Sequence, residues 1–488
     1  MFFTMGVSLY TTRIVLNALG VVDFGIYNVV GGVVSMLAFL SASMATATQR
    51  FFSFELGKKN HLQLNKIFCM SVNIHAIIAL FVLLVAESIG LWFLNNKLMI
   101  PLDRIEAANW VYQFSVASFI VTIMGVPYNA TIISNERMKI YAYISIIDVL
   151  MKLIIVFSLL WIRYDKLKIY AVLTFFVTVI IFMIYKVYCK RNFTSSNFKL
   201  YWDKKLFITL LNYSGWNLFG SAAGITMGQG VNILLNIFFG PTVNAARGVA
   251  FQVRGAVNML VTNFQVAINP QIVKSFASND LKYMHQIIFQ GSKFSFFLLY
   301  IFALPILIET EFILNLWLNN VPEYTIIFTR LALVNVLIDS LSGPLMSAAQ
   351  ASGNIKKYQA VVGGLLLLIL PLSYVFLKVG FGPEITLYIS ILISIIAMLV
   401  RLHIISSLVG FPIISFMKKV LVRIVLVAVI SILSPLVLIQ MMEYDLTRTI
   451  FVLSCSLISV LFSVYWFGIT DKERGLIRKE LKNLLIKI

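Results

Sequence analysis

The chain has 488 residues, of which 60% are hydrophobic and only 12% are charged, and its mean hydropathy is +0.92. A soluble domain is about 45–50% apolar, so this composition excludes a soluble protein and indicates an integral membrane protein. The net charge of +19 does not indicate nucleic-acid binding, because apolar runs recur along the whole length and leave no soluble basic domain.

Apolar runs of about 20 residues are long enough to cross a hydrocarbon core about 30 Å thick. The sequence contains fourteen such runs, which predict an all-α integral membrane protein with about 14 transmembrane helices. The first run has no basic segment before it and no small-residue cleavage site after it, so we expect no removable signal peptide. The predicted spans are 2–19, 26–49, 67–94, 108–133, 140–161, 167–185, 207–238, 243–272, 285–308, 325–351, 358–378, 385–408, 420–440 and 448–468.

Lys and Arg are distributed unevenly between the two sides of these spans. If the N-terminus is inside, most of the 39 Lys and Arg residues fall in the cytoplasmic loops and tail. This bias predicts a multi-pass protein with both termini in the cytoplasm, and a basic inner face attracts anionic membrane lipid. The predicted outer loops hold only Lys97, Arg104, Arg163, Lys166, Lys168, Lys378 and Arg448.

Two pairs of segments indicate an internal duplication. LGVVDFGIYNVVGGVV at 19–34 corresponds to FGPTVNAARGVAFQVR at 239–254, an offset of 220. VPYNATIISNERMKIY at 126–141 corresponds to GPLMSAAQASGNIKKY at 343–358, an offset of 217. Such agreement predicts two parallel-repeat six-helix bundles around a central cavity. The predicted domains are an N-terminal bundle at 1–190, a basic cytoplasmic linker at 191–206, a C-terminal bundle at 207–410, two additional helices at 411–470 and a basic cytoplasmic tail at 471–488.

A polar stripe follows one face of the eighth span. Arg247, Arg254, Asn258 and Gln265 are spaced by 7, 4 and 7 residues, which places them on one side of a helix. A cation at mid-membrane costs about 2.5–3.5 kcal/mol, so this face is expected to meet protein or water. The stripe therefore predicts a wet, cationic interior that binds an anionic substrate.

Other polar residues extend this prediction to neighbouring spans. Gln229 and Asn232 lie on one face of the seventh span, and Arg13 lies one turn before Asn17 on the first. Because the duplication relates the first two spans to the seventh and eighth, we expect these faces to meet between the halves. The result is a central, hydrated, net positive cavity.

Several cations have a simpler explanation. Arg13, Arg247 and Arg330 lie nearer the outer ends of their spans, where a long side chain reaches the interface. Arg50 ends the second span at the cytoplasmic side and fits the positive-inside distribution equally well. Arg254 lies about 10 Å deeper than Arg247, so it is the cation least readily explained as an anchor.

The acids within spans are candidates for energy coupling. Asp148 and Lys152 are four residues apart in the fifth span, where a neutralising ion pair is favoured over coupling. Asp339 in the tenth span is either a coupling acid or a structural hydrogen-bond acceptor. A proton or sodium gradient would need such an acid, and we expect no bound cofactor.

Enzymatic motifs are missing from the sequence. It has no G-x-x-x-x-G-K-[ST] phosphate loop, so we expect no ATP hydrolysis. The 4 histidines are scattered and the 3 cysteines isolated, which predicts neither a metal site nor a disulfide framework. The outer loops are too short for a glycosyl-transfer site, so transport is the expected activity.

The segment LYTTRIVLNALGVVDFGIYNVVGGVVSMLAFLSASMATATQRFFSFELGKKN at 9–60 strongly resembles bacterial O-antigen and polysaccharide-repeat flippases. These belong to the multidrug/oligosaccharidyl-lipid/polysaccharide exporter superfamily, which includes lipid II flippases and multidrug and toxin extrusion transporters. The resemblance implies alternating access in the bacterial cytoplasmic membrane. The implied substrate is an undecaprenyl-pyrophosphate-linked oligosaccharide, and the implied partners are other polysaccharide-assembly membrane proteins.

The resemblance also implies roles for particular residues. Lipid II flippases use cavity arginines on spans one, two and eight, and Arg13, Arg50 and Arg254 stand in similar places here. Relatives usually carry a short polar arm before the first span, whereas this apolar run starts at residue 2. The alternative within the same fold is a cation-coupled multidrug exporter, but the spans hold more cations than acids.

Overall fold

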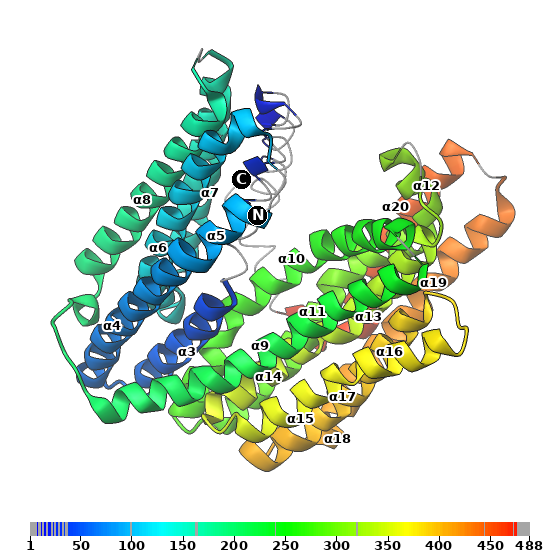
Figure 1. The fold of residues 1–488 in the computed structure, drawn as a ribbon. Coiled ribbons are helices and arrows are strands. Elements are labelled where there is room, and N and C mark those ends of the chain that lie inside the picture. The colour runs from blue at the N-terminus through cyan, green and yellow to red at the C-terminus, as the bar shows by residue number, and fades with distance from the viewer. Residues whose placement is uncertain are drawn as a thin grey trace, which may run out of the picture. The chain divides into compact units, whose positions relative to one another are not determined.

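The computed structural model describes residues 38–97, 100–161, 164–239, 241–318, 321–443, 445–471 and 473–475, with scattered positions between 7 and 34. These residues form helices joined by short turns, and the described ranges contain no strand. The chain divides into two compact units, residues 1–221 and 222–488 (Figure 1). The predicted all-α class is confirmed.

The first unit is built from helices between residues 38 and 221. Its most extensive helix packing is between α6 and α8, and α3, α4 and α7 pack against this pair. Buried residues such as Val111, Tyr112 and Leu167 form its core. The elements are α3 (Ala38–Gly57), α4 (His61–Val85), η1 (Ala86–Gly90), α5 (Leu91–Lys97), η2 (Leu102–Arg104), α6 (Ile105–Ser134), α7 (Met138–Trp161), α8 (Lys166–Asn192), η3 (Thr194–Ser196) and the first part of α9 (Lys204–Phe239).

The second unit continues α9 and packs its helices around α10 and α11. Its largest core holds Met284, Leu299 and Leu402. The further elements are α10 (Pro241–Ala277), α11 (Leu281–Ile308), α12 (Thr310–Trp317), α13 (Thr325–Ser340), α14 (Ser342–Ser352), α15 (Lys356–Leu367), α16 (Ile369–Lys378), α17 (Ile385–Val409), α18 (Ile413–Phe416), η4 (Met417–Leu421), α19 (Val422–Met441), α20 (Leu446–Ser463) and η5 (Val464–Gly468).

Eleven of the described helical segments are long and apolar enough to cross a membrane. They coincide within a few residues with the predicted third to seventh and ninth to fourteenth spans, because helix length and hydropathy follow from bilayer thickness. The eighth span is the long helix α10, whose polar face keeps it outside this apolar set. Most of the predicted segment 2–37 lies outside the described residues.

Polar side chains define where several helices begin. Asp165 accepts hydrogen bonds from the backbone N–H groups of the first turn of α8, and Asp280 does the same for α11. Such caps satisfy donors that the helix itself leaves open. At the other end, Gly410 follows α17 with a φ of 62°, a left-handed conformation that glycine adopts without strain. The boundaries of these helices are thus determined by residues at the boundaries themselves.

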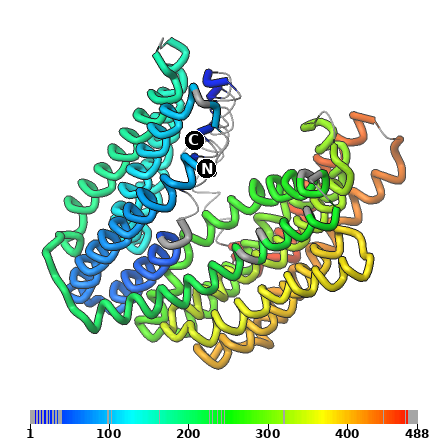
Figure 2. Tube along the Cα trace, viewed as in Figure 1, coloured from blue at the N-terminus to red at the C-terminus, as the bar shows by residue number. Residues whose placement is uncertain are grey.

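The segment between α8 and α9 is docked along α4 rather than looped away from it. Figure 2 shows this linker as an extended stretch between the two helices. Asn65 Nδ2 donates to the carbonyl oxygens of Ser195 and Asn197, and Asn73 Nδ2 donates to that of Tyr201. Because residues 65 and 73 share one face of α4, the linker backbone is held along that face. This contact fixes the start of α9 within the first unit.

Candidate functional site

A cavity of about 460 Å³ lies within the second unit, lined by α9, α10 and α13 to α17. In Figure 1 the helices α10, α13, α14 and α17 lie beside one another, in agreement with their packing contacts. The charged residues of its lining are Arg247, Arg254, Arg401 and Asp339. Three guanidinium groups and one carboxylate give this polar cavity a net positive charge.

The predicted stripe on α10 forms one wall of the cavity. Arg247, Arg254, Asn258 and Gln265 all line it, so at a rise of 1.5 Å per residue it follows the helix for about 27 Å. The ring of Phe251 lies under two guanidinium groups, with Cζ of Arg247 at 4.2 Å and Cζ of Arg254 at 5.2 Å from its centroid. This arrangement keeps two cations close together without a bridging carboxylate between them.

Arg247 and Arg254 differ in their accessibility. Arg247 is buried, with 7% of its surface exposed, and its Nη2 donates a long 3.4 Å hydrogen bond to the carbonyl oxygen of Gly228. The side chain of Arg254 is 25% exposed, and its Nη2 lies 3.1 Å from Oδ2 of Asp339, which is itself 35% exposed. Arg254 is therefore paired with an acid at the wall of an open chamber, not sealed in a dry core.

Asp339 connects Arg254 to a chain of neutral hydrogen bonds. Ser394 Oγ donates to Oδ1 of Asp339 at 2.9 Å, and Asn335 Nδ2 donates to Ser394 Oγ at 3.0 Å. The carboxylate thus receives one hydrogen bond from a cation and one from a hydroxyl. A change in the charge of Asp339 or in the position of Arg254 alters the contacts between α10, α13 and α17 together.

Gln265 has a structural partner that the sequence analysis did not identify. Its Nε2 donates to the carbonyl oxygen of Ser340 and to Oγ of Ser295, each at 3.0 Å. The Ser340 carbonyl lacks its usual helical donor because residue 344 is proline, which has no N–H. A Cβ at Gly343 would lie 2.1 Å from Oε1 of Gln265, so the amide also needs a glycine beside it.

Arg401 is a functional candidate that the sequence analysis missed. The positive-inside distribution assigns Arg401 to the cytoplasmic side, but Arg401 lies inside α17 and lines the cavity. Its Nη1 donates to Ser342 Oγ at 2.7 Å, and its Nε donates to Tyr358 Oη at 3.1 Å. Ser390, Ser394 and Arg401 are spaced by 4 and 7 residues on one helical face, a signal of the same kind as the stripe on α10.

Arg50 and Arg330 lie elsewhere. Arg50 is buried in the first unit, with its Cζ 4.6 Å from the ring centroid of Phe54 and 5.5 Å from that of Tyr213. Arg330 Nε donates to Thr310 Oγ1 at 3.2 Å, and Arg330 is not part of the cavity lining. Neither arginine lines the cavity that Arg247, Arg254 and Arg401 share.

The remaining candidates divide as follows. Asp148 and Lys152 form the expected ion pair, with Oδ2 and Nζ 2.8 Å apart. Asn232 Oδ1 accepts a hydrogen bond from Asn244 Nδ2 at 2.7 Å, so it joins α9 to α10 and does not line the cavity. Arg13 and the side chain of Gln229 lie outside the described residues. No group of three or more His, Cys, Asp or Glu residues suited to a metal ion occurs in the described ranges.

These helices and this cavity define a multi-span membrane protein with the fold of MATE transporters of the MOP superfamily. A multidrug resistance MATE family transporter in its outward-facing conformation has a TM-score of 0.71 and 13% identity, over 84% of this chain and 94% of that chain. A MATE in the straight conformation has a TM-score of 0.70 over the same shares, also at 13% identity.

A third solved structure has this fold at a TM-score of 0.69 and 12% identity, covering 83% of this chain and 93% of its own. It is a MOP superfamily transporter from Pyrococcus furiosus, described by a binding pocket of reverse polarity that suggests a different function. At such identities the likeness shows the shared fold. No family model matches the sequence, and no curated protein matches it.

Proposed function

We propose that the chain is a flippase that moves an undecaprenyl-pyrophosphate-linked oligosaccharide across the bacterial cytoplasmic membrane by alternating access, during the biosynthesis of a surface polysaccharide such as O-antigen or capsule. The observation that carries the proposal is the cluster of Arg247, Arg254 and Arg401 around one cavity with a single carboxylate. Guanidinium groups bind phosphate oxygens through paired, charge-assisted hydrogen bonds. A diphosphate carries enough negative charge to balance the cluster.

The cluster also offers graded access to an entering headgroup. Arg254 is partly exposed and its only carboxylate partner in the described ranges is Asp339, so phosphate oxygens compete with one carboxylate for its donors. Arg247 lies two helical turns away along α10. Asn258 adds an amide between the arginines and Gln265, where hydroxyl groups of a linked sugar find a hydrogen-bond partner.

The other transport function with this fold is multidrug export. An organic cation is attracted to carboxylates and aromatic faces, whereas the sole acid of this lining is already bound by Arg254 and Ser394. The Pyrococcus furiosus transporter, with its pocket of reverse polarity, supports the view that this fold serves more than one substrate charge. A cationic cavity favours an anionic lipid over a cationic drug.

The test is complementation across a panel of bacterial strains that each lack the flippase for a different glycan repeat. The chain is expected to restore surface glycan in the strain with the matched repeat, and Arg254→Ala is expected to abolish display at an unchanged protein level. Arg254→Lys should lose most of the activity, because an ammonium group cannot reproduce the planar fork. Full display by Arg254→Ala, or protection of cells from cationic dyes by the wild type, contradicts the proposal.

A further inference from the structure

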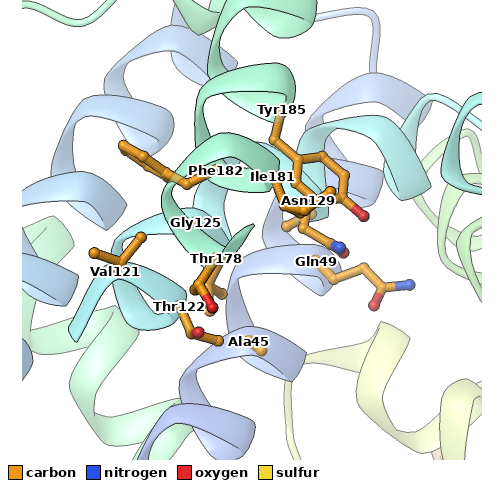
Figure 3. A pocket seen from close by; sticks show the side chains of 12 residues that line it. Ala45, Gln49, Val121, Thr122, Gly125, Asn129, Thr178, Ile181, Phe182 and Tyr185 are labelled. Atoms are coloured by element: carbon orange, nitrogen blue, oxygen red, sulfur yellow. The ribbon is translucent and has the colours of Figure 1, made fainter. Parts of the chain in front are cut away.

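A second cavity, of about 200 Å³, lies within the first unit between α3, α6 and α8 (Figure 3). Its polar lining residues are Gln49, Thr122, Asn129, Thr178 and Tyr185, and none of its lining residues is charged. The rest of its wall is apolar and includes the ring of Phe182. An uncharged cavity of this kind suits a neutral ligand with a few hydrogen-bonding groups.

The two cavities are lined by equivalent positions of the internal duplication. Gln49 on α3 and Gln265 on α10 are 216 residues apart, and both line a cavity. Four of the six α6 residues that line the first cavity stand 217 residues before lining residues of the second: Thr122, Gly125, Val126 and Asn129 before Asp339, Ser342, Gly343 and Met346. The two cavities thus share corresponding positions of the two halves.

Every charged residue that lines the second cavity corresponds to an uncharged residue in the first half of the chain. Asp339 corresponds to Thr122, and Arg401 corresponds to Tyr185, which lies 216 residues earlier. At the offset of 220 that relates 19–34 to 239–254, Arg247 and Arg254 correspond to Tyr27 and Val34. The first cavity therefore keeps some polar positions of the second, with Gln49 for Gln265 and Thr178 for Ser394, but none of its charged residues.

Gln49 and Tyr185 supply the chemistry of this neutral site. The amide of Gln49 has no hydrogen-bond partner among the described residues, whereas the amide of its counterpart Gln265 is bound to Ser340 and Ser295. Figure 3 shows the side chains of Tyr185 and Asn129 together on one side of the cavity. The site thus presents an amide with donors and an acceptor beside two aromatic rings.

These features argue against an ion and against a purely apolar occupant. Phosphate or an organic cation would need a partner of opposite charge. The acid that interacts electrostatically with Tyr185 is Asp148, and it is already paired with Lys152. An isoprenoid chain would leave the amide of Gln49 covered and unbonded, which is unfavourable. A sugar ring satisfies both requirements, because its hydroxyl groups bond the amide and its C–H face packs against an aromatic ring.

We propose that the cavity of the first unit, around Gln49, Asn129 and Tyr185, binds a sugar residue of the transported glycan, while the cationic cavity of the second unit binds the diphosphate. This assignment rests on the proposed flippase function. It divides recognition between two cavities of common origin, one for the charged part of the substrate and one for the neutral part. Specificity for a given glycan repeat then lies in the first unit.

The test compares two lipids with the purified full-length chain in nanodiscs. One is bare undecaprenyl diphosphate, and the other is the glycan-linked form that accumulates in the flippase-null strain that the chain complements. Gln49→Leu is expected to weaken binding of the glycan-linked lipid about 3- to 10-fold, the effect of one lost hydrogen bond to a neutral ligand. It should leave the affinity for the bare lipid unchanged.

A second variant tests the cavity by its volume. A Cβ at Gly125 would lie 3.6 Å from the Phe182 ring, an ordinary contact, so Gly125→Ala is expected to fold and Gly125→Leu to fill the cavity. Gly125→Leu should reduce the affinity for the glycan-linked lipid to that for the bare lipid. The matched control is Gly215→Leu on α9, where nothing lies within 4 Å of the added Cβ.

The outcomes separate the two proposals. Wild-type affinity for both lipids in Gln49→Leu and Gly125→Leu overturns the sugar site and leaves the flippase function standing. An equal loss for both lipids in the Gly125 variants also overturns it, because the cavity then holds the isoprenoid chain. Failure of the wild type to bind the bare lipid, or wild-type binding by Arg254→Ala, contradicts the diphosphate site of the proposed function.

Discussion

The side-chain amide of Gln265 donates a hydrogen bond to the carbonyl oxygen of Ser340. This carbonyl has no helical donor, because the residue four positions later is Pro344, which has no N–H. At this point the helical segment is interrupted: α13 ends at Ser340 and α14 begins at Ser342. Ser292 Oγ donates to the next carbonyl, that of Leu341, at 3.0 Å. The break between the two helices is therefore stabilised from α10 and α11 at the edge of the cationic cavity.

This relationship predicts a coupling between residues 265 and 344. Gln265→Leu leaves the Ser340 carbonyl without its partner and should lower the free energy of unfolding by about 1–3 kcal/mol. In a Pro344→Ala background the backbone N–H of residue 344 can donate instead, so the same substitution should cost clearly less. Thermal unfolding of the four proteins in detergent measures this double-mutant cycle, and additive losses would contradict the assignment.

The sequence predicted the spans because bilayer thickness sets their length and composition, and it predicted the face of α10 because helical periodicity is local. The partners of that face depend on neighbouring helices, which no local pattern specifies. Arg50 illustrates the difference: its position at the cytoplasmic end of a span was clear, but its contact with the ring of Tyr213 depends on the packing of α9 against α3. The bond between Gln265 and Ser340 likewise depends on a proline in another helix.

The sequence pattern did not identify Arg401 as a cavity residue for a related reason. Near the end of a predicted span, a cation is normally assigned to the interface, and the run of leucine and isoleucine around it masks the polar positions. The predicted span 385–408 already contains Arg401, and α17 runs to Val409, so Arg401 lies about two turns inside the helix. The Ser390, Ser394 and Arg401 spacing carried the information, but a serine in an apolar helix is too common to stand out.

Arg401 and Arg330 form a matched pair for testing the cavity. Arg401→Lys loses the forked contacts to Ser342 and Tyr358 and one planar phosphate ligand, so affinity for undecaprenyl diphosphate should fall about 5- to 30-fold. Arg330→Lys changes a side chain outside the cavity lining and should alter this affinity less than about twofold. Lipid titration in nanodiscs checks both variants. An equal loss of affinity in Arg401→Lys and Arg330→Lys would show that the phosphate does not bind in this cavity.

Asp339→Asn removes the carboxylate that holds Arg254 while keeping an acceptor for Ser394. We expect bare undecaprenyl diphosphate to bind about 3- to 10-fold more tightly, because the phosphate no longer competes with Asp339 for Arg254. If Asp339 couples transport to an ion gradient, glycan display should fall even though binding improves. Asp148→Asn is the comparison, and wild-type display in both variants would exclude coupling through either acid.

The last prediction concerns the pH dependence of stability. Glu473, after α20, is buried, and its Oε2 lies 2.6 Å from Nζ of Lys293 on α11. Burial alone would raise the pKa of Glu473, but hydrogen bonds from Lys293 and from the Thr470 N–H outweigh it and lower the pKa below the usual 4.5. The pair therefore contributes stability above about pH 4.5, and this contribution is lost as the pH falls through the lowered value.

Glu473→Gln leaves the Lys293 ammonium buried without its carboxylate, which should cost about 3–5 kcal/mol at neutral pH. The difference in unfolding temperature between wild type and variant should be largest near pH 7 and shrink below about pH 4.5, where the wild type also loses the charge. Asp471→Asn is the control, since Asp471 is 96% exposed in its pair with Arg474 and should change stability by less than about 0.5 kcal/mol. A difference between wild type and Glu473→Gln that stays constant from pH 7 to pH 3 would mean that the contact stabilises the chain by packing and not by charge.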